Sequence, residues 1–273
     1  LSIFTKTNRQ TVMNILDKII EHKKEEVTRN KNFVSLHQLQ QQENFNRQVI
    51  SLKKVLLDET KTGIIAEFKR RSPSKGIIND QADVLDVTTA YTKHGASGLS
   101  VLTDTEFFGG AADDLLKARV NNIPILRKDF MIDEYQLAEA RAMGADVILL
   151  IAACLTPHRV QELAFFAKSL QLEVLLEIHN ETELQHICDE VDLVGVNNRD
   201  LKTFSVDINR SVELSKQIPA DKIKIAESGI DKAETINIFK QAGFKGFLMG
   251  EHFMKFENPG EAFEQFVKKL KQG

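Results

Sequence analysis

Short apolar runs alternate with amphipathic stretches along the chain from residue 62 onward. Runs of this length, bounded by turn residues, predict buried strands of a parallel sheet. Eight such strands are expected: Gly63–Phe68, Gly98–Leu102, Ile123–Leu126, Asp146–Ile151, Leu172–Ile178, Leu193–Val196, Ile223–Ala226 and Gly246–Met249.

The segments between these runs have apolar residues at helical spacing. The clearest are Asp83–His94, Asp133–Met143, Pro157–Leu170 and Lys232–Gln241. Thr156-Pro157 and Asn180-Glu181 are typical of helix starts, because both pairs offer a capping side chain. Gly95, Gly144 and Gly243 follow periodic segments and are expected to end helices in the left-handed conformation.

Eight strand–helix units favour a (β/α)8 TIM barrel over an open α/β sheet. An open dinucleotide-binding sheet would place a GxGxxG turn after its first strand, and the sequence has none there. We therefore predict an α/β protein with a single domain, in which residues 61–273 form the barrel. Residues 1–60 have no place in this strand count and are expected to form an N-terminal helical extension packed on it.

The extension is predicted to contain two helices, Thr11–Arg29 and Ser35–Gln42. The first is amphipathic, and its lysines, Lys18 and the pair Lys23-Lys24, are expected on either side of the apolar stripe. That stripe consists of Val12, Ile15, Leu16, Ile19 and Ile20.

The composition gives no indication of a nucleic-acid or membrane partner. The chain has 273 residues, 42% of them hydrophobic, and a formal net charge of −3, which gives no overall basic excess for nucleic acid. The apolar run Val147–Leu155 is too short to span a bilayer, and the first residues lack the pattern of a signal peptide. Cys154 and Cys188 are interpreted as buried, reduced thiols. We expect a cytoplasmic monomer with no nucleic-acid or membrane partner.

The chemistry is expected at the C-terminal ends of the strands, where TIM barrels place their active sites. Glu67 and Lys69 share a face of the first strand because strand side chains alternate. A single pair of this kind also fits a salt-bridged strand end. Polar ends recur on five strands, however, and this recurrence favours a functional mouth. The other ends include Thr103, Asp104, Arg127, Lys128, Asp129, Glu177, Asn197, Asn198, Arg199, Glu227 and Ser228.

Three carboxylates and two lysines would meet at this mouth: Glu67, Glu177, Glu227, Lys69 and Lys128. We expect partial burial and neighbouring cations to lower a lysine pKa, and shielding to raise a carboxyl pKa. Such a set supplies an acid and a base near neutral pH. The histidines are expected at the surface or at helix ends, and no cluster has metal-ligand spacing. Acid–base catalysis without a metal or cofactor follows.

A phosphate site is expected beside the acid–base groups. Ser228-Gly229 and Gly250-Glu251 follow the seventh and eighth strands, where barrels hold phosphate through backbone amides. Ser72 and Ser74 could add hydroxyl groups from the loop after the first strand.

Aromatic residues occur near the same mouth. Phe107, Phe108 and Phe130 suggest that the substrate is an aromatic sugar phosphate, although ordinary barrel packing also explains Phe107.

Several blocks of sequence together resemble the indole-3-glycerol phosphate synthase family. The blocks run through nearly the whole chain, and those of the first and third strands are the most specific. They include Ile65-Ala66-Glu67-Phe68-Lys69-Arg70-Arg71-Ser72-Pro73-Ser74, Phe107-Phe108-Gly109-Gly110, Ile125-Leu126-Arg127-Lys128-Asp129-Phe130, Leu176-Glu177-Ile178-His179 and Ala226-Glu227-Ser228-Gly229-Ile230.

The resemblance implies a role for each matching residue. Lys128 matches the general acid of ring closure and Glu177 the general base, while Glu67 and Lys69 match residues for proton transfer and for the substrate carboxylate. The remaining matches are to the wall around carboxylate and sugar (Asn197, Arg199, Glu227), to the ring pocket (Phe108, Phe130, Leu149) and to the phosphate cradle (Ser72, Ser228, Gly229, Gly250, Glu251).

The implied substrate is 1-(2-carboxyphenylamino)-1-deoxyribulose 5-phosphate, which is closed to an indole with loss of CO2 and water. Glu251 departs from some relatives, in which a hydroxyl residue is common. A carboxylate would repel phosphate, so only the backbone amide of Glu251 is expected to contribute. The extension is expected to lie over the barrel mouth and to assist substrate binding, as it does in the family.

Two alternatives remain at this point. A phosphoribosylanthranilate isomerase-like barrel would carry a Cys/Asp pair at the ends of strands one and six, where this chain has Glu67 and Asn197. A non-catalytic, sugar-phosphate-binding subunit would be marked by loss of Lys128 or Glu177, and both are present.

Overall fold

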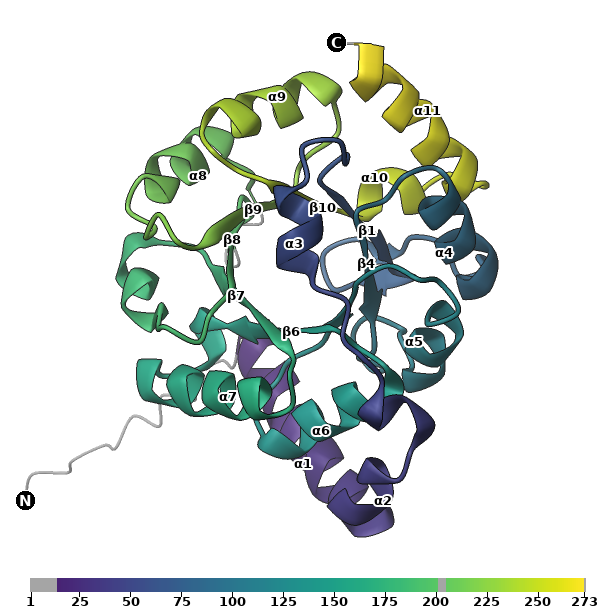
Figure 1. Cartoon of the computed structure of the whole chain (residues 1–273), viewed down its shortest axis with the longest axis vertical. Coiled ribbons are helices and arrows are strands. Elements are labelled where there is room, and N and C mark those ends of the chain that lie inside the picture. Colours follow the sequence, from purple (N-terminus) through teal and green to yellow (C-terminus); the bar gives the residue numbers. More distant parts are fainter. Residues whose placement is uncertain (1–13, 201–204, 273) are drawn as a thin grey trace, which may run out of the picture.

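Eight parallel strands close into a barrel in the computed structural model, which describes residues 14–200 and 205–272. Neighbouring strands pair in parallel all the way round, and β10 pairs with β1 to close the ring. Helices surround this ring (Figure 1). The predicted (β/α)8 fold is confirmed. Its strands are β1 (Ile64–Phe68), β4 (Gly98–Leu102), β5 (Ile125–Lys128), β6 (Val147–Ile151), β7 (Glu173–Ile178), β8 (Leu193–Asn197), β9 (Ile223–Glu227) and β10 (Gly246–Met249).

The largest error in the strand boundaries concerns β5. The sequence placed this strand over Ile123–Leu126, whereas it spans Ile125–Lys128. Proline has no amide hydrogen and therefore cannot donate to the ladder, so the strand begins after Pro124, whose carbonyl accepts from Leu99. Lys128 is consequently the last residue of the strand and not part of the following loop.

The helices around the barrel agree with the apolar periodicity. The four predicted helices correspond to α4 (Val84–Lys93), α6 (Glu134–Met143), α7 (Pro157–Ser169) and α9 (Ala233–Gln241). None of the helices in the described part of the chain is both long and apolar enough to cross a membrane. The other helices of the barrel region are α5 (Ala112–Ala118), α8 (Ile208–Ser215), α10 (Glu251–Met254) and α11 (Pro259–Gln272), with short 3-10 turns η2 (Ala152–Cys154) and η3 (Glu181–His186).

The helix ends follow the predicted signals. Gly95, Gly144 and Gly243 have φ of +99°, +91° and +85°, which is the left-handed conformation expected of a residue that ends a helix. Thr156 accepts from the amide of Arg159 at the start of α7. Asn180 also caps a segment, but this is the 3-10 turn η3 and not an α-helix.

The extension wraps around the barrel. It contains α1 (Ile15–Phe33), α2 (Leu36–Gln40), η1 (Glu43–Asn46) and α3 (Leu52–Leu57). Helix α2 confirms the second predicted helix, and α1 ends four residues later than predicted. The predicted start of α1 at Thr11 lies outside the described residues, as does Val12.

Helix α3 was not predicted, and it closes one end of the barrel. Figure 1 shows it across the middle of the ring of strands. Its buried Leu52 and Leu56 join the apolar cluster inside the barrel. Gly98 and Gly246 at the starts of their strands leave room for these leucines, since an added Cβ would lie 3.0 and 3.1 Å from their methyl groups. Helix α3 thereby shields the end of the core opposite the polar strand ends.

The buried stripe of α1 differs from the expected one. Ile19, Lys23 and Val27 are buried at a spacing of four residues, whereas Ile15 is exposed. The expectation that Lys23 lies beside the apolar stripe is wrong, because its side chain is fully buried. The sequence pattern gave no sign of the acidic partners that make this burial possible.

Candidate active site

Strand alternation brings the predicted acid–base residues together inside the barrel. The inward residues of β5, β7 and β9 are apolar near the strand starts, where Leu126, Leu175 and Ile225 belong to the inner cluster. Two residues further along the same strands, the inward residues become Lys128, Glu177 and Glu227. The polar layer therefore lies directly above the apolar core of the barrel.

Lys128 bridges two buried carboxylates. Its Nζ lies 2.9 Å from Glu177 Oε2 and 3.8 Å from Glu227 Oε2. Both glutamates are almost completely buried, at 3% and 1% exposure. Burial removes water from these side chains, so the Lys128 ammonium is the main charge that compensates the Glu177 carboxylate.

Glu67 and Lys69 form the second ion pair of the mouth. Lys69 Nζ lies 2.8 Å from Glu67 Oε1, which confirms that the two side chains share a face. Ser100 on the neighbouring strand β4 donates to Glu67 Oε2 at 3.4 Å. Gly250 leaves space for this carboxylate, because a Cβ at that position would lie 2.6 Å from Glu67 Oε1.

The protonation of this cluster differs partly from expectation. Burial opposes the charge of Lys128, but the carboxylates of Glu177, Glu227 and Glu67 outweigh it, so the Lys128 pKa is raised. The expected lowering of its pKa is therefore wrong. Burial and the nearby Glu177 carboxylate raise the pKa of Glu227 to about 8, which agrees with the expectation for a shielded carboxyl.

Glu177 has the opposite shift. Burial disfavours its charge, yet the ammonium of Lys128 and the contact with His179 hold its pKa well below the ordinary value. Asn197 Nδ2 also donates to Glu177 Oε1 at 3.0 Å. Glu177 is therefore the ionised member of the carboxylate pair, and Glu227 is the member that carries a proton near neutral pH.

His179 is a site residue that the sequence analysis missed. Its Nε2 lies 3.1 Å from Glu177 Oε1 and its Nδ1 lies 3.3 Å from Glu183 Oε2. Burial disfavours the imidazolium, but the two carboxylates outweigh it and raise the His179 pKa to about 10. The expectation that all histidines are at the surface or at helix ends is wrong for this residue.

A sequence signal for His179 was present. It lies two residues after Glu177, the same spacing that placed Lys69 beside Glu67, and therefore points into the barrel. His186 is also buried, with its ring nitrogens 3.0 Å from the carbonyl oxygens of Glu183 and Leu155.

The end of β8 supplies the wall beside Glu177. Asn197 Oδ1 accepts from the Arg199 amide at 3.1 Å, so a single side chain connects the carboxylate to the following turn. The Arg199 guanidinium lies 3.5 Å from Glu251 Oε2 at the end of β10. Asn197 therefore contacts Glu177 while the Arg199 guanidinium contacts Glu251, and the shared face that alternation predicts stays a prediction.

The two phenylalanines that are expected around the substrate ring lie close together. The rings of Phe108 and Phe130 lie 6.0 Å apart, and Phe130 packs on the inner apolar cluster that contains Leu149. Phe107 instead meets the ring of His22 on α1, edge to face at 5.8 Å. Phe107 thus helps to dock the extension, which fits its assignment to packing.

The expected phosphate residues occur on adjacent strands. Ser72 lies on a small hairpin after β1, formed by β2 (Arg71–Ser72) and β3 (Gly76–Ile77), and its hydroxyl is 3.4 Å from that of Ser74. Gly250 follows β10, the neighbour of β1, and is the N-cap residue of α10. Ser228 and Gly229, after β9, both have φ of +68°.

The backbone at Ser228 is held in a conformation that is uncommon for serine. Asn198, completely buried, donates to the Ser228 carbonyl at 2.7 Å and stabilises this turn. Position 229 favours glycine for two reasons. Its φ is +68°, and an added Cβ would lie 2.4 Å from a methyl group of Val206. Asn198 was noted only as a polar strand end, and its supporting role could not be read from the sequence.

The side chain of Glu251 is half-buried and faces two cations. Its carboxylate lies 3.6 Å from Lys75 Nζ and 3.5 Å from the Arg199 guanidinium. These two cations are of the type that binds phosphate. The carboxylate of Glu251 therefore lies among the groups that an anionic substrate would use.

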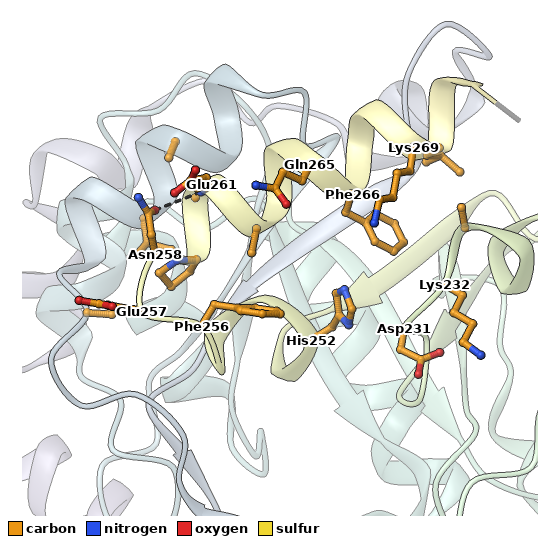
Figure 2. A pocket seen from close by; sticks show the side chains of 18 of the residues that line it. Asp231, Lys232, His252, Phe256, Glu257, Asn258, Glu261, Gln265, Phe266 and Lys269 are labelled. Atoms are coloured by element: carbon orange, nitrogen blue, oxygen red, sulfur yellow. Dashed lines mark hydrogen bonds between the residues drawn. The ribbon is translucent and has the colours of Figure 1, made fainter.

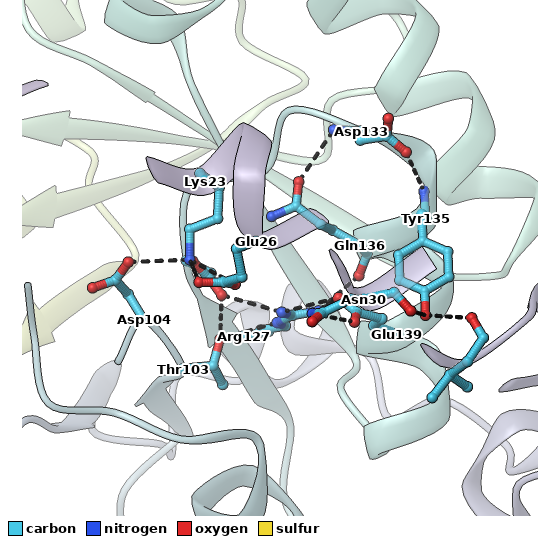
Figure 3. A network of polar contacts seen from close by, with 12 residues as sticks. Lys23, Glu26, Asn30, Thr103, Asp104, Arg127, Asp133, Tyr135, Gln136 and Glu139 are labelled. Atoms are coloured by element: carbon cyan, nitrogen blue, oxygen red, sulfur yellow. Dashed lines mark hydrogen bonds and ion pairs between the residues drawn. The ribbon is translucent and has the colours of Figure 1, made fainter. Parts of the chain in front are cut away.

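A second missed feature connects the extension to the mouth. Lys23 of α1 forms ion pairs with Asp104 and Asp129, which follow β4 and β5 (Figure 3). Arg127 belongs to the same buried network and points away from the barrel interior, toward α6, where it donates to the Gln136 carbonyl at 2.8 Å. Although Arg127 was grouped with the converging strand ends, the structure places its side chain outside the mouth.

A groove of about 1380 Å³ lies away from this mouth, between α4, α9, α10 and α11 (Figure 2). His252 and Phe256 line it together with acidic residues such as Asp231 and Glu261. None of the acid–base residues described above lines the groove. Within residues 14–200 and 205–272, no three His, Cys, Asp or Glu side chains come together as metal ligands would.

Comparison with known proteins agrees with the family resemblance seen in the sequence. The family model described as indole-3-glycerol phosphate synthase matches residues 16–266. The indole-3-glycerol phosphate synthase of Bacteroides thetaiotaomicron is 47% identical over 258 residues, covering 94% of this chain and 99% of the relative. That of Salinibacter ruber is 42% identical over 257 residues, with 93% and 95% covered.

Solved structures show similarity at the level of the fold. The alpha subunit of tryptophan synthase from Legionella pneumophila aligns with a TM-score of 0.60 at 13% identity, over 81% of this chain and 97% of that one. The 3-hexulose-6-phosphate synthase of Salmonella typhimurium gives 0.61 at 11% identity, over 77% and 99%. The family model, by contrast, matches residues 16–266, and the two curated relatives are 47% and 42% identical over more than nine-tenths of the chain. The chain therefore belongs to the indole-3-glycerol phosphate synthase family.

Proposed function

We propose that the residues at the barrel mouth divide the work of the family's reaction between an acid, a coupled carboxylate pair and a set of anion and ring contacts. The reaction is the carboxy-lyase step that gives indole-3-glycerol phosphate in tryptophan biosynthesis. The observation that carries the division of roles is the position of Lys128, whose ammonium is shared by the buried carboxylates of Glu177 and Glu227.

Lys128 would act as the general acid of ring closure. Protonation of the substrate ketone by its ammonium makes the carbonyl carbon electrophilic, and the ring carbon that bears the carboxylate attacks it. Loss of CO2 then restores aromaticity. A positioned proton transfer of this kind contributes roughly 10²- to 10⁴-fold to the rate.

Glu177 would become a better base as a consequence of this first step. While Lys128 is charged, its ammonium holds the pKa of Glu177 well below the ordinary value. Once Lys128 has given its proton to the ketone, this stabilisation disappears and the pKa of Glu177 rises. Glu177 would then remove a proton from the carbon next to the hydroxyl-bearing carbon, while Lys69 would give a proton to the departing hydroxyl, so that water leaves and the indole is complete.

Glu67 and Lys69 would form the second acid–base pair, with Lys69 also close enough to the mouth to meet the substrate carboxylate. Glu227 and Asn197 would bind sugar hydroxyls, since both present polar atoms inside the mouth. Phe108, Phe130 and Leu149 would hold the aromatic ring, because the two phenyl rings and the inner apolar cluster are contiguous.

The phosphate would bind at the opposite side, where Ser72, Ser228, Gly229 and Gly250 follow adjacent strands. Glu251 would contribute only its backbone amide. The Arg199 guanidinium would leave the Glu251 carboxylate and bind the anionic substrate instead. Fixing the substrate at both ends would bring its ring and ketone together, which is a contribution of positioning.

The extension and the barrel would act as one domain, because the contacts of α1, α2 and α3 are with the barrel and its helices. The remaining expectations, a cytoplasmic location, a monomeric state and the absence of a nucleic-acid partner, are proposed on composition and family resemblance. A stable dimer in a sedimentation experiment would contradict the proposed monomeric state.

Formation of indole from the deoxyribulose phosphate provides the direct test. The protein has no tryptophan, so the indole fluorescence of the product appears without a tryptophan background. We expect turnover by the protein as given, with no added metal. No indole from a folded protein at saturating substrate would reject the proposed division of roles.

A further inference from the structure

We propose that Lys23, in the N-terminal extension, is a positioning residue for this reaction: its ammonium fixes the two loops that carry Phe108, Phe130 and Lys128. The inference rests on the roles proposed above for these three residues. It concerns a side chain that does not line the mouth itself, because Lys23 is completely buried beneath α1.

The burial of Lys23 is unusual enough to need an explanation. Lysine is rarely buried completely unless it is paired, because removing an ammonium from water is costly. Its neighbours on the same stripe of α1, Ile19 and Val27, are apolar and would suffice to dock the helix. A well-packed apolar residue in place of a buried ion pair is often neutral or stabilising, so stability alone gives little reason for a lysine here.

Three carboxylates surround the ammonium. Its Nζ lies 2.9 Å from Asp129 Oδ1, 3.1 Å from Asp104 Oδ2 and 3.0 Å from Glu26 Oε1. Burial opposes the charge of Lys23, but these carboxylates outweigh it and raise the Lys23 pKa. The cation is therefore permanently charged, and it connects α1 to the loops after β4 and β5 (Figure 3).

Asp104 connects Lys23 to the first aromatic residue. Its Oδ1 accepts from the amides of Phe107 at 2.8 Å and Phe108 at 3.2 Å, so this carboxylate shapes the turn that holds the Phe108 ring. Its Oδ2 is buried and accepts no hydrogen bond from elsewhere among the described residues. Lys23 is thus the one cation that contacts the Asp104 carboxylate in the described part of the chain.

Asp129 connects Lys23 to the acid and to the second aromatic residue. It stands between Lys128 and Phe130 in the chain, and its Oδ1 accepts from the Phe130 amide at 2.8 Å. Its Oδ2 accepts from Thr103 at 2.6 Å and lies 3.1 Å from the Arg127 guanidinium. Asp129 would keep Arg127 as a partner if Lys23 were lost, whereas Asp104 would lose the one ion pair that it forms within the described residues.

The geometry therefore makes one ammonium the link between both walls of the ring pocket. Without it, the Asp104 carboxylate would move toward water and take the turn at Phe108 with it. A displacement of about 1 Å in a positioning group can reduce a rate by about 10²-fold. A role in docking alone would lower stability without changing the kinetic constants of the folded protein.

The test compares Lys23→Met with Lys24→Met, a control on the exposed face of the same helix. We expect Lys23→Met to raise KM about tenfold and to weaken binding of the product, indole-3-glycerol phosphate, by a similar factor. Product binding can be followed by its indole fluorescence. Lys24→Met should match the parent protein in both measurements.

A second variant tests the proposal in case Lys23→Met does not fold. Lys23→Met/Asp104→Asn removes one cation and one carboxylate together and keeps the Asp104 oxygen that accepts from the loop amides. We expect it to be more stable than Lys23→Met but still weak in product binding. Parental KM, kcat and product affinity in either folded variant would overturn the proposal. If the parent protein binds product but makes no indole, the proposed function fails, and the binding comparison still tests Lys23.

Discussion

The carboxylate of Glu227 lies directly against the backbone of Gly195 on the neighbouring strand. A Cβ atom at position 195 would lie 1.9 Å from Glu227 Oε1 and 3.0 Å from its carboxyl carbon. Glycine is therefore needed here for space and not for an unusual φ. Since Glu227 shares Lys128 with Glu177, the missing side chain of Gly195 determines where the acid–base cluster sits.

Gly195→Ala is accordingly expected to displace Glu227 and lower kcat by about tenfold or more. Substitutions in contact are not additive, so a double-mutant cycle measures the contact itself. In a Glu227→Ala background, Gly195→Ala should have little further effect on kcat. Equal effects of Gly195→Ala in both backgrounds would show that it acts through the barrel packing around Leu175 instead.

Lys128→Ala should fold and lose nearly all turnover. Removing the ammonium that Glu177 and Glu227 share abolishes the proposed acid, and we expect kcat to fall by about 10²-fold or more. Lys117→Ala, at an exposed ion pair on α5, serves as the control and should keep parental kcat. Near-normal turnover in a folded Lys128→Ala protein would remove this lysine from the mechanism.

The paired shifts of Glu177 and Glu227 predict how stability depends on pH. The pKa of Glu227 is about 8 in the folded protein, raised by burial and by Glu177, and roughly 4.3 when unfolded. Its protonated form therefore stabilises the fold fully at low pH, and this contribution is lost as the pH rises through about 8. The lowered pKa of Glu177 has the opposite sign, and its contribution is constant above the unfolded value.

Between pH 6 and pH 9 the Tm of the parent protein should therefore fall, while that of Glu227→Gln should fall less, because an amide cannot lose the proton. Glu213→Gln, exposed on α8, should behave like the parent protein. Thermal unfolding at both pH values makes the comparison. The same loss of Tm in Glu227→Gln and in the parent would show that Glu227 does not titrate in this range.

The strands and their inward residues could be predicted because both follow from local periodicity. Alternation placed Glu67 with Lys69, and the structure agrees on this pair. The boundary of β5 was missed because its run of apolar residues begins before Pro124. A rule on ladder hydrogen bonds decides that boundary, and hydrophobicity alone does not show it.

The buried polar network was beyond such local rules. Lys23 and Asp129 are far apart in sequence, and only the docking of α1 brings them together. A lysine beside an apolar stripe normally extends to solvent, so its complete burial depends on partners from another part of the chain. The partition of charge between Glu177 and Glu227 likewise depends on distances that no sequence pattern supplies.

His179 is expected to set the pH at which Glu177 becomes a base. Its imidazolium lies 3.1 Å from Glu177 Oε1, and Glu183 holds it from the other side. An opposite charge at this distance lowers a carboxyl pKa by roughly one to three units.

His179→Gln removes that charge but keeps a polar side chain, so the pKa of Glu177 should rise. The acidic limb of the kcat profile should therefore move to higher pH by about one unit. Activity lost on the acidic limb should therefore recover at higher pH, which a merely structural defect would not do. His158→Gln, on the exposed start of α7, should leave the profile in place. An unmoved acidic limb in a folded His179→Gln protein would mean that Lys128 and Asn197 alone control Glu177.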